Sequence, residues 1–438
     1  MLTSRCGRML IFSLSMGALV GVGGVPTQTA CAQDGAVAGG DESATAKEDA
    51  PATSDTVAAK RVAEDAAEAL VTVLGTYVGE RVQRRDAYAK TEAARAPMAA
   101  VRRALDWLAI HQTNEGGWDA DEFELQCRLN KCADPATSIA DVGVSGAALL
   151  AFLGAGETQS TGRYRSAVKR GLRFLTAQQD AEGCLSRRDS ATFLHDHMWA
   201  TLAVTEAYAL TGSQRWKAHA QRAVDFVLAA ENPYLGWGHG VRRGDNTTTM
   251  TALAMAVLRA AEDAELFDDA VVRRGAVAWV TKLTSAATGR VGNLTRGGAS
   301  DPKRFPALVG LGPTAAALMV RLYAGESPAR NASFAGGAKL VRQEPPRAPA
   351  DGEEADFAYW YWGSLAMFQS QGADWQAWRA PLRKALLATQ RREPGRDEVG
   401  SWDASGPRGV HGGRVFATAL NCMTLEIEYR YEVIFERE

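Results

Sequence analysis

A pattern that recurs along the chain constrains its fold more than any other feature. Four segments share a basic start, a small residue, an apolar residue and then an aromatic one: VRRALDWLAIHQ (101–112), VKRGLRFLTAQQ (168–179), AQRAVDFVLAAE (220–231) and RRGAVAWVTKL (273–283). A final variant, LRKALLATQ, covers 382–390. The aromatic residues Trp107, Phe174, Phe226 and Trp279 are 67, 52 and 53 residues apart. This spacing fits one helical hairpin with its loops, so we expect an architecture of repeated hairpins.

Helices of a second kind lie between these charged segments. They are apolar on nearly all sides, are rich in Ala and Gly, and cover 142–156, 198–212, 247–261, 313–325, 357–369 and 415–429. A helix that is apolar all round is buried, whereas a striped, charged helix faces solvent. The alternation, with six helices of each kind if a degenerate outer helix lies near 328–342, predicts an all-α fold: a closed α/α toroid over 97–438. In a closed ring the first and last hairpins cover each other.

The N-terminus has the features of a secretory signal peptide. Arg5 and Arg8 precede the apolar run 9–25, and Ala30-Cys31-Ala32 forms a cleavage site. We therefore predict a signal peptide over 1–32, an exported protein in the periplasm or outside the cell, and no integral membrane span in the mature chain. A lipidated Cys31 and an uncleaved anchor are alternatives, although Gln28 stands where a lipobox favours Leu.

Two further segments precede the toroid. Residues 33–56 contain almost no large apolar residue, which predicts a disordered linker. Residues 57–96 form an N-terminal segment that is predicted to be one long charged helix, with an apolar stripe that includes Val62, Leu70 and Val73. This helix could pack on the toroid, act as a stalk or contact a protein partner.

Charge and cysteine content limit the partners and cofactors. Lys and Arg total 49 against 51 Asp and Glu, so nothing favours nucleic acid as a partner. In an oxidising compartment Cys127 and Cys132, in the loop CRLNKC, are expected to form a local disulfide. A metal site would need two more soft ligands nearby, and the adjacent sequence offers none, so neither a metal nor a cofactor is predicted. Cys184 and Cys422 are expected to be small buried residues.

The turns that follow the outer helices carry a motif. Gln or Glu is followed by Gly and often by Trp in QTNEGGW (112–118), QQDAEGCL (178–185), ENPYLGWG (231–238) and QRREPGRDEVGSW (390–402). The Gln side chain can bond the turn backbone, Gly permits the tight turn, and Trp can cover the neighbouring hairpin. We therefore interpret five tryptophans as packing residues: Trp107, Trp118, Trp237, Trp279 and Trp402.

This motif resembles the QW-type repeat of squalene–hopene cyclases and the related repeat of protein prenyltransferase β subunits. The segments DFAYWYWGSLAMFQSQGADWQAW and GGRVFATALNCMTLEIEYRY resemble still more closely exported bacterial proteins with prenyltransferase/squalene oxidase repeats, known mostly from planctomycetes. The resemblance covers residues 97 to about 431 and implies the toroid of the terpenoid cyclase and prenyltransferase superfamily. It carries no activity across, because a fold does not dictate chemistry.

The catalytic motifs of these families are not matched. A squalene-type cyclase uses a D-x-D-D acid, and the nearest string, Asp119-Ala120-Asp121-Glu122, lies in a turn and has Glu in its fourth place. Asp268-Asp269 does not continue into D-D-x-x-D, and no D-x-C for a prenyltransferase zinc begins an inner helix. In the string 195–197 the two histidines point about 200° apart on a helix. The simpler interpretation of that string is one exposed His, one packed His, and Asp196 as N-cap.

Candidate binding residues cluster before the inner helices, whose N-termini converge on one mouth of a toroid. Asp caps of first-turn amides explain most of them, whereas six positive helix ends around one cavity would favour an anion. Arginines of the preceding loops (Arg187, Arg188, Arg242, Arg243, Arg296, Arg304 and Arg408) add to the second account. The ligand-binding candidates are Asp141, His197, Asp245, Tyr361, His411 and Arg414.

Three functions follow from these observations. The first is an exported protein that binds a lipid-like or partly apolar anionic small molecule in the central cavity. The second is an enzyme, either an isoprenoid cyclase or transferase, or a glycan hydrolase or lyase with Asp141 and Asp245 as its carboxylate pair. The third is a protein-interaction scaffold that uses the N-terminal helix. The sequence leaves open whether the protein is an enzyme at all.

Overall fold

The computed structural model describes residues 79–138, 140–233, 235–298, 310–406 and 409–435. The predicted signal peptide, the linker and the first part of the N-terminal helix lie outside these residues. The described residues all belong to one compact unit, Ala58–Glu438. They are mainly α-helical and contain no β-strand, only two isolated bridges, Asn232–Gly236 and Thr284–Val291.

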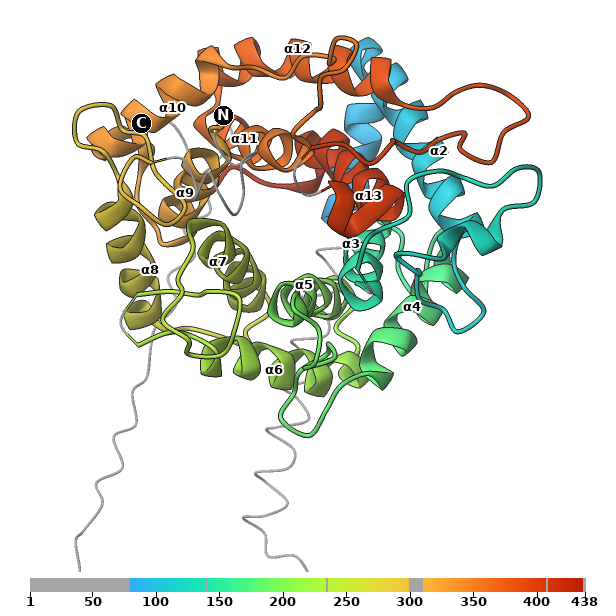
Figure 1. Cartoon of the computed structure of the whole chain (residues 1–438), viewed down its shortest axis with the longest axis horizontal. Coiled ribbons are helices and arrows are strands. Elements are labelled where there is room, and N and C mark those ends of the chain that lie inside the picture. Colours follow the sequence, from blue (N-terminus) through green and yellow to red (C-terminus); the bar gives the residue numbers. More distant parts are fainter. Residues whose placement is uncertain (1–78, 139, 234, 299–309, 407–408, 436–438) are drawn as a thin grey trace, which may run out of the picture. The chain divides into compact units, whose positions relative to one another are not determined.

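The helices form two concentric rings (Figure 1). The inner ring consists of α3 (Asp141–Gly154), α5 (Phe193–Thr211), α7 (Thr248–Asp263), α9 (Gly312–Tyr323), α11 (Phe357–Ser370) and α13 (Gly409–Arg430). The outer ring consists of α2 (Arg95–Ile110), α4 (Arg165–Ala177), α6 (Gln214–Ala229), α8 (Ala270–Leu283), α10 (Ala332–Gln343) and α12 (Gly372–Thr389). Each inner helix packs on the next, and α13 packs on α3, so the ring is closed. The predicted α/α toroid is confirmed, including the degenerate outer helix, which is α10.

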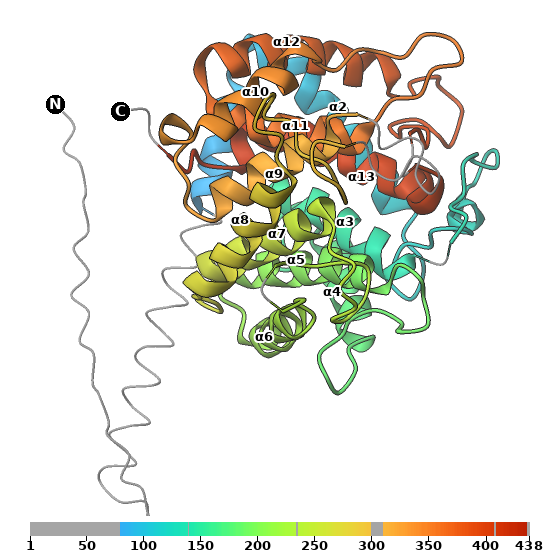
Figure 2. The same cartoon turned by 60° about the vertical axis from the view of Figure 1, so that its left-hand side comes forward.

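Short 3-10 helices complete the described structure: η1 (Glu92–Ala94), η2 (Phe123–Gln126) and η3 (Pro328–Arg330). The predicted N-terminal helix does not run unbroken to 95. Residues 79–89 are helical, a turn follows at Lys90, and η1 then leads into α2. The turned view in Figure 2 shows the two rings from the side.

In three of the repeats, the glutamine of the turn motif bonds the following outer helix. The Nε2 of Gln112 donates to Gly116 O at 2.7 Å and to Ala167 O of the next outer helix at 2.9 Å. Gln179 and Gln390 make the same two kinds of bond, to their own turn and to the following outer helix. Because Gln390 bonds Ala100 of α2, the last repeat is tied to the first and the ring is locked.

Glycine and tryptophan take the places expected of them in these turns. Gly116 has φ +97°, and a Cβ there would lie 2.7 Å from Arg170 O on the next outer helix. Trp118 is fully buried, and its indole N–H donates to Leu108 O at 2.7 Å. Trp237 and Trp402 repeat that bond, to Val227 O and Leu386 O. The predicted packing tryptophans are all buried.

Small residues allow the inner helices to approach one another closely. A Cβ on Gly146 of α3 would lie 2.6 Å from the backbone nitrogen of Ala200 on α5, far inside van der Waals contact. The buried side chains of the core are mostly Ala, Leu and Val. At a small separation between helix axes, no room remains for larger side chains along these seams.

Arginines of the N-terminal helix cover the C-terminal ends of two inner helices. Arg81 donates to Leu153 O at 3.2 Å, and Arg85 donates to Ala155 O at 2.6 Å. Arg84 donates to Tyr429 O at 3.2 Å. These carbonyls belong to the last turns of α3 and α13, where carbonyl groups lack partners within their own helix and a positive charge is favourable. The segment 79–89 therefore packs on this end of the ring.

Candidate functional site

The N-terminal turns of four inner helices surround a small cavity. Its volume is about 70 Å³, and its lining comes from α5, α7, α11, α13 and the loop before α7. The lining residues are His195, Trp199, His239, Thr249, Met250, Leu253, Ala358, Tyr361, Trp362, Phe416 and Leu420. The predicted convergence on one mouth is thus observed for four of the six inner helices.

Aromatic side chains form most of the cavity wall. The Trp199 ring lies 5.5 Å from that of Phe416 and 6.3 Å from that of Tyr361, measured between centroids. Tyr361 in turn lies 5.3 Å from Trp362 in an edge-to-face arrangement. All four side chains are between 3% and 8% exposed, so the wall is preformed and largely dry. Such a wall favours an apolar or π-bearing group over a hydrated one.

His195 brings the main polar group to this wall. Its Nε2 accepts a hydrogen bond from the Trp199 indole N–H at 3.1 Å, so Nε2 carries no proton. Its Nδ1 lies 3.5 Å from Asp196 Oδ1. Asp196 also accepts a hydrogen bond from the Thr192 hydroxyl at 2.7 Å, which fixes the carboxylate. The imidazole is thereby held in a fixed orientation at the edge of the cavity.

Four carboxyl groups gather where the turn after α2 meets the N-terminal ends of α3 and α5: those of Asp119, Asp121, Asp141 and Asp196. The carboxyl oxygens of Asp119, Asp121 and Asp141 lie within 4.8 Å of one another. Burial, together with the charges of Asp119, Asp121 and Asp196, raises the pKa of Asp141 to about 6, against a bond from Ala120 N–H that acts to lower it. The turn that contains Asp119 and Asp121, which the sequence placed away from the inner helices, is thus in contact with one of them.

Tyr361 connects the cavity to the far end of the ring. Its hydroxyl lies 3.5 Å from the Tyr431 hydroxyl, beyond the last turn of α13. Burial, and after it the neighbouring Tyr431, raises the pKa of Tyr361 well above its usual value. Tyr361 is therefore a neutral polar group on the cavity side of the ring. Of the six candidates from the sequence, it is the one that lines the cavity.

His197 lies in the core, away from the cavity. Its Nδ1 accepts from Leu185 N–H at 3.0 Å, and its Nε2 donates to Ala223 O at 3.1 Å. In other repeats a hydroxyl takes the place of that acceptor: Ser145, Thr251 and Thr418 accept from Trp118, Trp237 and Trp402 N–H. Both nitrogens of His197 are used in holding a repeat turn, so as a candidate binding residue it is explained by packing.

Arg414 and His411 also differ from the arrangement expected of them. Arg414 is 1% exposed and bonds Ala133 O, Ser401 Oγ, Asp134 and Asp403, each at 2.7–2.8 Å. The arginine therefore joins two loops and presents no free group to an anion. His411 is exposed and precedes a break in α13 at Gly413, where φ is 60°.

Of the aspartates near the starts of the inner helices, one caps its helix and others do not. Asp356 is the N-cap of α11 and accepts from Tyr359 N–H at 2.9 Å. Asp196 lies inside α5, which begins at Phe193, and so is not its N-cap. Asp245 is exposed and accepts from His239 N–H at 3.3 Å, while Thr247 caps α7. The structure groups Asp141 with Asp119 and Asp121, not with Asp245.

The rim arginines are mostly engaged within the protein. Arg187 pairs with Asp189, and Arg188 pairs with Asp180 and Glu182. Arg242 donates to Ala229 O, and Arg296 donates to Lys282 O. Arg304 and Arg408 lie outside the described residues. The guanidinium groups of Arg187, Arg188, Arg242 and Arg296 therefore serve local contacts at this rim.

The four cysteines within the described residues are present as thiols. Cys184 and Cys422 are buried, as expected. Cys127 and Cys132 face the ring of His111, so the His ligand that the adjacent sequence lacked is supplied by the end of α2. The disulfide between these two cysteines stays a prediction.

A second hollow lies on the outside of the ring. It is a groove of about 790 Å³ between η3, α10, the α11–α12 connection and Phe435. Its lining mixes apolar residues with four charged ones, Arg330, Lys339, Arg342 and Asp374, of which three are basic. Among the described residues, no helix combines the length and the apolar character that a membrane crossing requires.

Sequence reasoning missed His195, Trp199, His239 and Phe416 as lining residues of one cavity. Trp199 and Phe416 are 217 positions apart, on two apolar helices whose pattern indicates burial only. Their positions offered a clue, because Trp199 and Phe416 both lie about two turns from the start of an inner helix, at the mouth of the ring.

Comparison with known proteins agrees with this architecture. The profile of the squalene-hopene cyclase C-terminal domain family matches residues 86–306, half of the chain. The chain belongs to this family. It is 28% identical over 196 residues to a squalene–hopene cyclase of Bradyrhizobium diazoefficiens, and 26% identical over 185 residues to a probable one of Sinorhizobium fredii. The matches span 40% and 38% of this chain but only 28% and 27% of those cyclases.

Solved structures show the same fold in proteins of different chemistry. A type II terpene cyclase from Scytonema, bound to geranylgeranyl dihydroxybenzoate, superposes with TM-score 0.50 at 17% identity, over 76% of this chain and 98% of the cyclase. An inactive variant of an alpha-1,6-mannanase from Salegentibacter sp. HEL1_6, bound to alpha-1,6-mannotriose, superposes with TM-score 0.51 at 12% identity, over the same shares. The squalene-cyclase-like toroid is thus established, and the chemistry depends on the cavity itself.

Proposed function

We propose that this protein is an exported binding protein, which holds the apolar part of a lipid-like, isoprenoid-type ligand in the aromatic cavity at the N-terminal mouth. The carrying observation is the wall itself: Trp199, Tyr361, Trp362 and Phe416 enclose the space, and no carboxyl group is among its described lining residues. Protonation of an alkene requires a strong acid, and the polar groups of this lining are imidazole, hydroxyl and indole groups. The wall is therefore suited to binding rather than to initiating a cyclisation.

The size of the cavity limits how much of a ligand it can hold. Pockets for drug-sized ligands typically measure about 300–1,000 Å³, and this cavity measures about 70 Å³. It therefore accommodates one end of an isoprenoid chain and not a whole triterpene. The imidazoles of His195 and His239 stand at its edge, where a polar or anionic head group would lie.

The helix ends around the mouth already have hydrogen-bond partners within the protein. Thr247 and Asn293 occupy the first-turn N–H groups of α7, and Asp356 occupies one in α11. These helix ends are therefore unavailable to an anion unless a cap is displaced. We expect an isoprenoid alcohol to bind nearly as tightly as its phosphate ester.

Binding can be measured through the tryptophans of the wall. Titration of the purified protein with farnesol and with farnesyl phosphate should quench tryptophan fluorescence, because Trp199 and Trp362 line the cavity. Ala358→Phe would fill the cavity from α11 and should weaken binding of either ligand at least tenfold. Ala335→Phe is the matched control, because Ala335 is exposed in the outer groove.

Unchanged affinity in Ala358→Phe would contradict the assignment to the cavity. A loss of affinity confined to Ala335→Phe would place the ligand in the outer groove instead. Much tighter binding of the phosphate ester than of the alcohol would show that the anionic head dominates recognition. The unfolding midpoint of each variant, compared with that of the unaltered protein, separates these outcomes from a loss of folding.

One observation favours an enzyme as the second candidate. Asp141, with a pKa of about 6, retains its proton to a higher pH than an ordinary carboxyl group, as a general acid must. Asp196 links it to the cavity, since Asp196 contributes to that pKa and also contacts His195. Incubation with squalene or with a mannan would then give a new product that Asp141→Asn abolishes and Asp245→Asn does not. Absence of any product at pH 5–6 would contradict this second function for these two substrate classes.

A further inference from the structure

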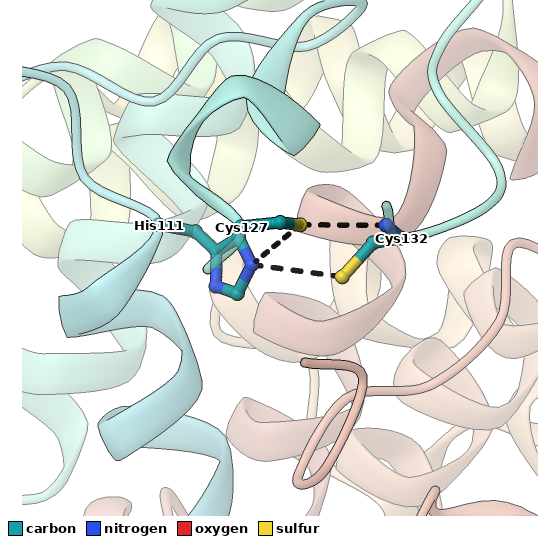
Figure 3. A group of neighbouring side chains, drawn as sticks. All are labelled: His111, Cys127 and Cys132. Carbon is teal, nitrogen blue, oxygen red and sulfur yellow. Dashed lines mark hydrogen bonds between the residues drawn. The ribbon is translucent and has the colours of Figure 1, made fainter. Parts of the chain in front are cut away.

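A histidine and two cysteines meet under the loop that joins α2 to α3 (Figure 3). His111 is the residue that follows α2, Cys127 follows η2, and Cys132 lies five residues further on. The Nε2 of His111 is 3.5 Å from Cys127 Sγ and 3.6 Å from Cys132 Sγ. His111 is 1% exposed and Cys132 is 2% exposed, so the group is almost wholly enclosed.

The tautomer of His111 is fixed by its other nitrogen. Nδ1 lies 2.9 Å from Trp107 O, which can only accept, so Nδ1 carries the proton. The unprotonated Nε2 then directs its lone pair at the two sulfur atoms, as Figure 3 shows. The imidazole also stacks on the Trp107 ring at 4.1 Å between centroids, which holds its plane. A backbone carbonyl on the far nitrogen is the usual way in which a metal-binding histidine is oriented.

The distances fit a metal ion better than they fit hydrogen bonds. One lone pair can accept one S–H donor, yet two sulfur atoms lie at nearly equal distances from Nε2. With Zn–S near 2.3 Å, Zn–N near 2.0–2.1 Å and tetrahedral angles, the nitrogen and sulfur ligands of a zinc ion are about 3.6 Å apart. The separations of 3.5 and 3.6 Å agree with that value.

The cysteine loop is shaped by hydrogen bonds of its own backbone. Cys132 N–H donates to Cys127 Sγ at 3.3 Å. Asp397 Oδ2 accepts from three successive backbone N–H groups, those of Arg128, Leu129 and Asn130, at 2.5–2.9 Å. Asp397 comes from the turn after α12, so the last repeat shapes the loop of the first.

We propose that His111, Cys127 and Cys132 bind a zinc ion, with water as the fourth ligand. Two thiolates neutralise the charge of Zn²⁺, so the enclosed site would carry no net charge. The site would fasten the α2–α3 loop to the end of the outer helix. It is independent of the ligand cavity, because none of its three residues lines that cavity.

The test uses the full mature chain, purified without chelator from an exporting host. We expect one zinc per chain by elemental analysis. Cobalt added after zinc removal should give a thiolate-to-cobalt absorption band. Cys127→Ser and His111→Gln should remove the band and the zinc, whereas Cys184→Ser, at a remote buried thiol, should keep both. Asp397→Asn should weaken zinc binding by roughly 10–100-fold, as loss of an outer-shell partner does.

A zinc-free protein whose mass is lower by two hydrogen atoms, and whose Cys127 and Cys132 are joined in a peptide map, would overturn the proposal in favour of the disulfide. Zinc retained equally in Cys127→Ser and in the unaltered chain would overturn it as well. If His111→Gln fails to fold, Cys127→Ser alone decides, since Cys127 is only partly buried and Ser differs from it by one atom.

Discussion

The two ends of the inner ring are stabilised by different means. At the N-terminal mouth, neutral hydrogen bonds recur from repeat to repeat, as in the contacts of Gln112, Gln179 and Gln390. The buried Arg414 at this end pairs with Asp134 and Asp403, whose side chains are about one third exposed. At the opposite end, a single network of buried charges joins Arg430 to Glu206 at 2.7 Å and to Glu426 at 3.3 Å, with Arg81 as a further partner of Glu206.

The difference shows which end is available to a ligand. At the charged end, the guanidinium and carboxyl groups are paired with one another, and the helix 79–89 and the residues after α13 cover them. Gly154 lacks the Cβ that would collide with Glu426 and Arg430, so even the backbone makes room for this network. At the mouth, the repeated bonds lie between hairpins and leave the inner faces of the helices to the aromatic wall. A binding site at the mouth therefore requires no change in the hydrogen bonds that hold the repeats together.

The largest expected effect comes from the charged end. Arg430→Met would leave Glu206 buried with Arg81 as its remaining cation, and should lower the free energy of unfolding by about 3–5 kcal/mol. Burial raises the pKa of Glu426 to about 8, so near pH 7 that side chain is mostly neutral and Glu206 is the ionised partner. Denaturant unfolding at pH 7 measures the loss.

Arg259→Met is the control for this change. Arg259 pairs with Glu262 and Asp263 on the surface of α7, with about a third of its side chain exposed. Its loss should cost no more than about 1 kcal/mol, because solvent screens such pairs. Equal losses of unfolding free energy in the two variants would show that the buried Arg430 network stabilises the fold no more than the surface pairs of Arg259 do.

The next effect comes from the mouth end. Gly400 has φ +99°, and a Cβ on it would collide with Arg103 O on α2. Gly400→Ala should therefore cost about 2–4 kcal/mol, from left-handed strain together with the overlap. Gly395→Ala measures the left-handed strain alone, because Gly395 has φ +80° and a Cβ on it would meet nothing within 4 Å.

Thermal or denaturant unfolding of both glycine variants gives the comparison. A cost for Gly400→Ala no greater than that for Gly395→Ala would mean that the approach of successive repeats is not what fastens the mouth end. The expected excess would show that one repeat contact, the one that closes the ring, contributes to the whole fold.

The repeats could be predicted from the sequence because their contacts are local and recur. Gln112, Gly116 and Trp118 lie within seven residues. The same spacing returns at Gln179, Gly183 and Leu185, and the turn of Gln390 keeps the residue types at a longer spacing, with Gly400 and Trp402. The charged network could not be predicted, because Arg430 and Glu206 are 224 positions apart and occur once. The cavity wall and the His111 group share this property: each joins residues from helices or loops whose own patterns indicate only burial or a turn. The contacts that recur between repeats therefore predict the fold, whereas the candidate sites are formed by residues that differ between repeats.

The smallest effect tests whether the mouth end retains an unbalanced charge. The folded-state pKa of Asp141, about 6, lies above its usual value of 3.8, so the folded chain holds this proton more tightly than the unfolded chain. Stability from this group is present below pH 3.8 and is lost as the pH rises toward 6.

Asp141→Asn keeps an oxygen for Ala120 N–H and removes the charge. It should therefore match the original chain near pH 3.8 and exceed its stability above pH 6, by on the order of 1 kcal/mol, because partial exposure screens the repulsion. Denaturant unfolding as a function of pH measures this difference, with Asp245→Asn, at an exposed site, as the control. A difference that does not change with pH would mean that the four carboxyl groups do not repel one another, and that Asp141 is an ordinary first-turn aspartate favoured by its helix. The expected pH dependence would show that Asp141, at the mouth, exchanges a proton near neutral pH without a buried cation beside it. Glu426, at the opposite end, has the buried Arg430 as its neighbour.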